Sequence, residues 1–187
     1  MPEVVLRAAD EGPVDFILNL LSPVIVPPAV LKAARIAAVN FHPAPPKWPG
    51  VGSASFALYE GDAEFGVTAH LMAERVDSGA ILKVIRFPIL ATDDCQSLWE
   101  RALHHSLLLF CDVAHQLARE GHVAPCGDRW ERPPVTRKQF ERWMTLPADA
   151  PADEIRRKVR ALRHPKFPGP FIEIGGVRVP HPAADAA

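Results

Sequence analysis

The pattern of apolar and polar residues predicts that the chain begins with a strand, a helix and a second strand. Residues 14–21 form a short apolar run bounded by turn residues, and the length of this run suits a buried strand better than a helix. Pro27 and Pro28 open a short helix over residues 29–35, and residues 36–42 form the next strand. Since strand–helix–strand is the unit of a parallel sheet, we expect an α/β fold.

The next segment predicts a short helix followed by a pair of strands. Ser53 is placed to cap a helix over residues 54–60. Residues 65–72 alternate in part between apolar and polar side chains, and residues 81–89 form a second run of this kind. A turn at residues 77–79 lies between the two runs. We therefore expect a hairpin here.

A long amphipathic helix is the clearest element of the chain. Apolar residues recur every three or four positions between residues 98 and 117. Asp93, with Gln96 three residues later, has the spacing of a capping box, and Gly121 supplies the stop. We expect this helix to lie against the sheet.

The last third of the chain is rich in loops. Residues 122–150 carry one short helix near residues 138–144, and a second helix is predicted over residues 153–162. Residues 171–179 indicate a hairpin that turns through two glycines. The tail at residues 183–187 is expected to fray.

Composition and charge are those of an ordinary soluble protein. The 187 residues are 48% hydrophobic and 23% charged, and the net charge of −1 gives no chain-wide electrostatic surface for nucleic acid or membrane. No apolar run approaches the roughly 18 residues of a membrane span, and the start lacks the pattern of a signal peptide. We therefore expect no membrane partner.

Cysteines and histidines indicate a reduced protein without a metal site. The three cysteines are odd in number and show no CxxC spacing, which favours a cytoplasmic location. His104, His105 and His115 of the long helix have no carboxylate or cysteine at ligand spacing. We therefore expect no bound metal.

One strand end gathers residues with catalytic potential. Asn40 and His42 lie two residues apart at the carboxyl end of the predicted strand, where chemistry concentrates in open α/β sheets. An amide and an imidazole together can stabilise the oxyanion that forms when a nucleophile adds to a carbonyl. Asp77 would favour the charged imidazole and pass protons through water. This chemistry fits acyl transfer from a carrier to an amine, although Asn-x-His at a strand end is more often structural.

Four ordered motifs resemble the signature series of the folate-dependent formyltransferases, which include methionyl-tRNA, glycinamide ribonucleotide and sugar N-formyltransferases. These motifs are Asn40-Phe41-His42-Pro43, Pro49-Gly50, Gly66-Val67-Thr68-Ala69-His70 and Asp77-Ser78-Gly79-Ala80-Ile81. Residues 20–24 resemble the folate-pocket segment that precedes the active-site strand. The resemblance is strong over about residues 14–110 and looser over residues 150–180.

The resemblance implies a partial Rossmann-like formyltransferase fold with a parallel sheet and a small C-terminal extension. We expect a catalytic core over residues 1–130 and a helical and hairpin extension over residues 131–187. Members of the family carry about three further strands before the segment that opens this chain, so truncation at the N-terminus is expected. An uncovered edge strand near residues 14–21 would favour homo-oligomers. Ala44 also departs from the family, because a serine usually follows the His-Pro pair.

The resemblance further implies a formyl donor, 10-formyltetrahydrofolate, and catalytic roles for Asn40, His42 and Asp77. The acceptor amine would attack the formyl carbon while Asn40 and His42 hold the oxyanion. Asp77 would position His42 and help to move the amine proton through a bound water. The residues expected to bind the folate are Leu20, Leu21, Ser22, Val24, Thr68 and Val76.

Several interpretations stay open at the level of sequence. The acceptor amine belongs to a sugar nucleotide, an aminoacyl-tRNA or another small molecule. The same three residues would serve a hydrolase that releases formate from the donor, and the missing N-terminal layer suggests a truncated, non-catalytic relative. Thr68 either orders a water or is simply a β-branched strand residue. His70 is expected to pack on its strand, and Trp48 either lines the site or pins the loop.

Overall fold

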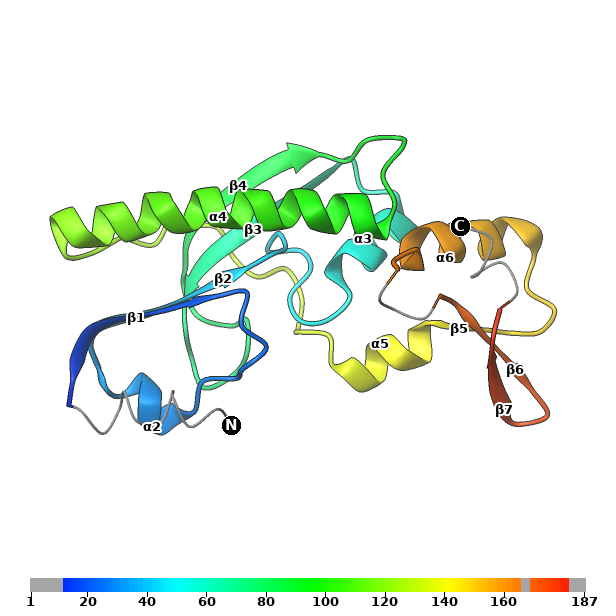
Figure 1. Ribbon diagram of the computed structural model, residues 1–187, viewed down its shortest axis with the longest axis horizontal. Helices are drawn as coiled ribbons and strands as arrows, with labels where there is room; N and C mark the ends of the chain where they lie inside the picture. Colours follow the sequence, from blue (N-terminus) through cyan, green and yellow to red (C-terminus); the bar gives the residue numbers. More distant parts are fainter. Residues whose placement is uncertain (1–11, 166–168, 182–187) are drawn as a thin grey trace.

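The computed structural model describes residues 12–165 and 169–181. Figure 1 shows one long helix, α4, running along a sheet, with the short C-terminal elements gathered at the α3 end of the molecule. In chain order the elements are β1 (Val14–Leu20), α2 (Pro28–Leu31), β2 (Ala34–His42), α3 (Ser53–Glu60), β3 (Glu64–Leu71), β4 (Ile81–Pro88), α4 (Cys95–Glu120), α5 (Arg137–Trp143), β5 (Thr145–Leu146), α6 (Ala152–Leu162), β6 (Phe171–Ile174) and β7 (Val177–Pro180).

The larger sheet has the strand order β1-β2-β3-β4. β1 runs parallel to β2, as the strand–helix–strand pattern predicts, and β3 and β4 form the predicted hairpin. β2 and β3 are also antiparallel, so the sheet is mixed rather than wholly parallel. β1 forms one edge of this sheet, with Val14 exposed, which agrees with the edge strand expected near residues 14–21.

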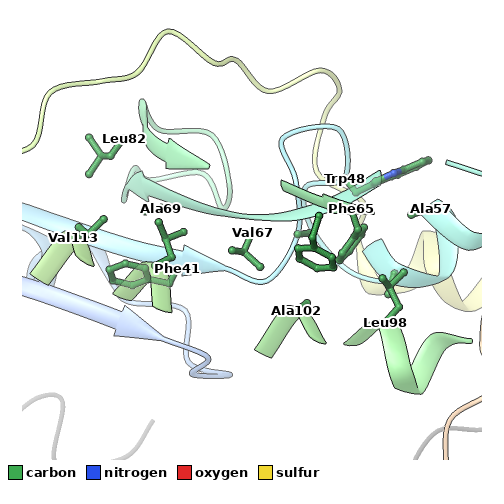
Figure 2. Close-up of a cluster of buried hydrophobic side chains, with 14 of the residues drawn as sticks. Phe41, Trp48, Ala57, Phe65, Val67, Ala69, Leu82, Leu98, Ala102 and Val113 are labelled. Atoms are coloured by element: carbon green, nitrogen blue, oxygen red, sulfur yellow. The ribbon is translucent and has the colours of Figure 1, made fainter. Parts of the chain in front are cut away.

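One face of this sheet packs against α4 and forms the core. The buried residues that β2, β3 and α4 contribute to this core include Phe41, Val67, Ala69, Leu98, Ala102 and Val113 (Figure 2). Side chains alternate between the two faces of a strand, so Asn40 and His42 of β2 point away from α4. The strand that carries the candidate chemistry is therefore fixed by its apolar neighbours.

The predicted long helix is confirmed as α4, but its cap lies one residue later than expected. Asp94 rather than Asp93 is the cap, because its carboxylate accepts the Ser97 backbone N–H at 2.9 Å. The Asp94 backbone N–H donates in return to the Ser97 hydroxyl at 3.0 Å, so Ser97 replaces Gln96 as the third helical residue of the box. Gly121 ends the helix as predicted.

Two short helices differ from their predicted bounds. α2 covers only Pro28–Leu31, because β2 already begins at Ala34, where it pairs with β1. Ser53 is the first residue of α3 rather than its cap, and Gly52 holds the cap position with φ 81°. A side chain would be strained at this φ, and a Cβ there would also collide with the ring of Phe140.

The C-terminal part contains α5, α6 and a small sheet with the order β5-β6-β7. The two helices and the β6–β7 hairpin agree with the prediction. β5 is an additional strand of two residues that runs parallel to β6, and two residues are too few to leave a periodic signal. α6 is joined to α3 by the Tyr59 hydroxyl, which donates to Glu154 at 2.6 Å. The tail that was expected to fray lies outside the described residues.

Candidate active site

A row of polar side chains crosses the face of the sheet that points away from α4. Asn19 of β1 is the register partner of Asn40 of β2, which also pairs with His70 of β3. His42 and Thr68 form the neighbouring pair of β2 and β3. Residues two apart on a strand, and residues paired across strands, share a face of the sheet. These five side chains therefore lie on one surface.

Hydrogen bonds along this row hold the Asn40 side chain at both ends. Asn19 Nδ2 donates to Asn40 Oδ1 at 2.8 Å, and Asn40 Nδ2 lies 3.0 Å from His70 Nε2. His70 Nδ1 lies 2.8 Å from the Leu71 carbonyl oxygen, a contact that requires a hydrogen on Nδ1. With its hydrogen on Nδ1, the ring can accept a hydrogen bond from Asn40 through Nε2. His70, expected only to pack on its strand, takes part in the polar row.

Asp77 reaches the same place from the connection between β3 and β4. Its φ is 45°, and the residue is 5% exposed. Oδ2 accepts the Gly50 backbone N–H at 2.8 Å and lies 3.4 Å from His42 Nδ1. Oδ1 lies 3.3 Å from His70 Nε2. The carboxylate is therefore buried between two imidazoles.

Burial and neighbouring charges decide the protonation of this cluster. Burial raises the pKa of Asp77, but the charge of His42, the contacts with His70 and the Gly50 N–H outweigh burial and lower that pKa to about 2. Burial lowers the pKa of His42, and this effect exceeds the opposing effects of Asp77 and the Trp48 carbonyl. At neutral pH we therefore expect an ionised Asp77 beside a neutral His42.

Both ring nitrogens of His42 face groups of the protein. Nε2 lies 3.0 Å from the Trp48 carbonyl oxygen, which requires a hydrogen on Nε2. Nδ1 faces Asp77 Oδ2 at 3.4 Å. In this conformation the ring has no nitrogen left over for a substrate, so Asn40 is better placed than His42 to donate to one.

The loop that follows β2 is held by two buried residues. Thr68 is fully buried, and its hydroxyl donates to the Ala44 carbonyl at 2.7 Å, so it supports the loop. Trp48 is 1% exposed, donates its indole N–H to Asp62 at 2.7 Å and stacks on Phe56. Of its two predicted roles, Trp48 therefore pins the loop.

Trp130 lies against both imidazoles. Its ring centroid is 5.0 Å from that of His70 and 6.0 Å from that of His42. The indole N–H donates to the Gly79 carbonyl at 2.8 Å, which joins Trp130 to the connection that carries Asp77. Trp130 was not predicted to belong to the site. It lies in a loop-rich part of the sequence, where a single aromatic residue without a periodic pattern gives no signal of its contacts.

The other residues expected to bind folate lie at the end of β1 and in two connections. Leu21, with φ 52°, is 41% exposed directly after β1. Val76 is 46% exposed and adjoins Asp77. Leu20 is the last residue of β1 and is half-buried. Ser22, which is exposed, and Val24, which is half-buried, lie between β1 and α2.

Among the residues that the structure describes, no group of three or more His, Cys, Asp or Glu side chains could hold a metal ion. Within the same part of the chain, no helix is long and apolar enough to cross a membrane.

The sequence matches a known family over the strands and the connection that build the polar row and carry Asp77. The profile of that family, described as formyl transferase, covers residues 2–113, which is more than half of the chain. The chain belongs to the formyl transferase family. The match includes β1, β2 and β3, and thus the polar row together with Asp77.

Curated relatives of this family member are methionyl-tRNA formyltransferases. That of Latilactobacillus sakei is 30% identical over 173 residues, which cover 88% of this chain and 51% of the relative. That of Levilactobacillus brevis is 31% identical over 176 residues, which cover 92% of this chain and 54% of the relative. The chain therefore spans about half the length of the curated relatives it matches.

A solved structure of a sugar N-formyltransferase from a Shewanella species has the same fold. Its TM-score to this formyl transferase family member is 0.79 at 21% identity, and the match covers 96% of this chain and 72% of that one. An N-formyltransferase from Helicobacter canadensis, in complex with folinic acid and dTDP-3-aminofucose, has a TM-score of 0.67 at 19% identity, with 87% and 59% covered. The mixed α/β fold is thus part of the formyltransferase fold.

Proposed function

We propose that this chain transfers a formyl group from 10-formyltetrahydrofolate to an acceptor amine, with Asn40, His42 and Asp77 at the reaction centre. The observation that supports this most is the buried cluster in which the Asp77 carboxylate lies between His42 and His70, next to Asn40. Buried titratable groups with displaced pKa values are typical of sites that move protons. The cluster lies within the residues that match the family.

A folate-type donor is proposed from the chemistry of the two connections beside the polar row. Leu21 and Val76 offer exposed apolar side chains, which suit a flat pteridine ring. Leu21 and Asp77 are the non-glycine residues with positive φ in the part of the chain that the structure describes. Residues with a strained backbone conformation are often found at ligand-binding sites. The Helicobacter canadensis relative holds folinic acid. The donor-binding residues that we propose are Leu20, Leu21, Ser22, Val24 and Val76, with Thr68 as a support of the loop.

In the proposed reaction the acceptor amine attacks the formyl carbon. A nitrogen–carbon bond forms, and the bond from that carbon to the folate nitrogen breaks. Asn40 donates an amide hydrogen to the formyl oxygen as negative charge develops there. Asp77 accepts the proton that the amine releases, directly or through water, and passes this proton to the folate nitrogen as that nitrogen leaves. His42 contributes a second hydrogen bond once its ring turns away from the Trp48 carbonyl.

The acceptor that we favour is an amino sugar nucleotide. The net charge of −1 argues against tRNA, because surfaces that bind nucleic acid are strongly basic. The relative from Helicobacter canadensis holds dTDP-3-aminofucose, whereas the curated relatives are named for methionyl-tRNA. Both acceptors therefore belong in the test.

We also propose a cytoplasmic location and a tendency to form homo-oligomers. The three cysteines are free, which fits a reducing compartment. β1 leaves an edge of the larger sheet that a second copy would cover. Light scattering across a range of concentrations measures this association.

Turnover of the purified chain tests the proposed function. The chain is incubated with 10-formyltetrahydrofolate, and tetrahydrofolate is followed by absorbance with a dTDP-amino sugar, with methionyl-tRNA or with no acceptor. Turnover that requires an amine supports transfer and identifies the acceptor class. Formate release without an amine would identify a hydrolase. No turnover, together with no donor binding by calorimetry, would identify a non-catalytic relative and overturn the proposal.

A further inference from the structure

Asn19 ends the polar row and has no part in the reaction proposed above. It is half-buried in β1, and its Nδ2 donates to Asn40 Oδ1 at 2.8 Å. The two residues are register partners in a parallel strand pair. Their contact is therefore built by the pairing of β1 with β2 rather than by a mobile loop.

The orientation of the Asn40 amide decides what it can do. The two ends of an amide have nearly the same shape, but one end only donates hydrogen bonds and the other only accepts them. With Oδ1 occupied by Asn19, Nδ2 points along the row toward His70 and uses one hydrogen there. The second hydrogen stays available for a substrate oxygen. The reversed amide would present an oxygen, which would repel a developing oxyanion.

The protonation of His70 Nε2 shows which orientation of the Asn40 amide is present. Its Nδ1 carries a hydrogen because of the Leu71 carbonyl, so only the state of Nε2 varies. Nε2 lies 3.0 Å from Asn40 Nδ2, which can only donate a hydrogen bond, and its contact with Asp77 Oδ1 is longer, at 3.3 Å. Nε2 therefore accepts from Asn40. A reversed Asn40 amide would instead place an oxygen there and require a hydrogen on Nε2.

We propose that Asn19 is a positioning residue that holds the Asn40 amide with its NH₂ group toward the reaction centre. This role rests on the proposed formyl transfer for its consequence in catalysis. The orientation itself exists in the resting protein and does not depend on any substrate. The two aspects can therefore be measured separately.

Imidazole nitrogen shifts in NMR spectra of the full chain test the orientation. Wild-type His70, assigned by the loss of its signals in His70→Gln, is expected to have a hydrogen on Nδ1 and none on Nε2. Asn19→Asp preserves the shape but only accepts, so Asn40 must turn its NH₂ group toward residue 19. His70 Nε2 is then expected to gain a hydrogen. Asn19→Ala leaves the amide free, and signals of both His70 states are expected.

Steady-state kinetics test the consequence. Asn19→Asp is expected to lower kcat by about 100-fold, the effect of losing one oxyanion donor, with the KM for the donor changed by less than about threefold. Asn19→Ala should lower kcat by about tenfold, and it should have no further effect in an Asn40→Ala background. Asp15→Asn is the matched control, since it makes the reverse exchange at an exposed position of β1. This control should leave kcat and the His70 shifts unchanged.

The outcomes separate this inference from the proposed function. A hydrogen on Nε2 in the wild type, or His70 shifts and kcat that stay constant in both Asn19 variants, would overturn the role of Asn19. If the wild type turns over no acceptor while the His70 shifts respond as expected, the orienting role stands and the proposed function fails. Thermal melts identify any variant that does not fold, and Asn19→Ala then replaces Asn19→Asp as the deciding variant.

Discussion

Asp77 combines an unusual backbone with an unusual environment. Its φ of 45° lies in the left-handed region, which aspartate and asparagine tolerate better than most residues. Its carboxylate accepts the Gly50 N–H and lies close to His42 and His70. An asparagine at this position keeps the backbone and one acceptor oxygen but loses the charge. The substitution Asp77→Asn therefore separates the effect of the charge from the effect of the backbone conformation.

We expect Asp77→Asn to lower kcat by at least about 100-fold, because the group that accepts the amine proton is lost. The folded state should survive, with a melting temperature within a few degrees of the wild type. Parallel assays of turnover and thermal unfolding measure both effects. Asp112→Asn on α4, where the carboxylate is half exposed, is the control and should change neither. Wild-type turnover in Asp77→Asn would contradict the assigned role.

His42 gives the protein a stability that depends on pH. Its pKa is below 6.5 in the folded state, so the unfolded chain binds the proton more readily. The stability is fully present above pH 6.5 and is lost as the pH falls toward the folded pKa, by at most about 1.4 kcal/mol per pH unit. Urea unfolding between pH 7.5 and 5 should show that the free energy of unfolding falls less steeply with decreasing pH in His42→Gln than in the wild type. His115→Gln, at an exposed position, should keep the wild-type dependence of the free energy of unfolding on pH.

At the scale of elements, the loop after β2 joins the site to the segment after α4. Gly50 has φ 87°, and its backbone pairs with Val135 while its N–H binds Asp77. A Cβ at Gly50 would lie 2.3 Å from the Val135 carbonyl oxygen, so a side chain would push the two segments of this contact apart. The same displacement would withdraw the N–H from the carboxylate.

We expect Gly50→Ala to lower the free energy of unfolding by about 3 kcal/mol, from backbone strain and the clash together. Gly61→Ala is the matched control, because Gly61 has φ 73° with open space around its Cα, and strain alone costs about 1 kcal/mol there. Urea unfolding gives both values. Equal losses in the two variants would mean that the Val135 contact is unimportant.

Lys158 fastens α6 to the rest of the molecule. Its ammonium group donates to the Trp143 carbonyl at 2.9 Å and lies 3.5 Å from the Trp143 ring and 4.4 Å from the Tyr59 ring. Burial lowers its pKa to about 8, which still leaves a charge at neutral pH. Lys158→Ala should destabilise the protein by about 1–3 kcal/mol. Lys138→Ala, at an exposed position of α5, should change stability by less than about 0.5 kcal/mol in the same urea titration.

The helices and strands could be predicted from the periodicity of apolar residues, whereas the side-chain contacts between them could not. β1, β2, the hairpin, α4 and α6 each leave a repeat of apolar residues in the sequence. The cap of α4 was misplaced because Asp93 and Asp94 are equally suitable residues, and only the backbone conformation distinguishes them. The contacts of Asn19 and His70 depend on register between strands, which no local pattern contains. Trp130 comes from a loop whose path is set by backbone bonds to distant residues.

At the scale of the whole molecule, the larger sheet separates stability from chemistry. Its α4 face is closed by apolar packing, and its other face carries the polar row, Asp77 and Trp130. Substitutions on the polar face should therefore change activity more than folding, and those on the α4 face the reverse. The chain spans about half the length of its curated relatives, and the family match runs through the part that builds this face.

The alternation of β2 also links the quality of a preparation to its activity. A shift of β2 by one residue against β1 and β3 would turn Asn40 and His42 into the core and bring Val39 and Phe41 to the polar face. Such a molecule would be both badly packed and inactive, so intermediate forms with a sound core and a broken site are disfavoured. Specific activity should therefore serve as a count of the correctly paired molecules in a sample.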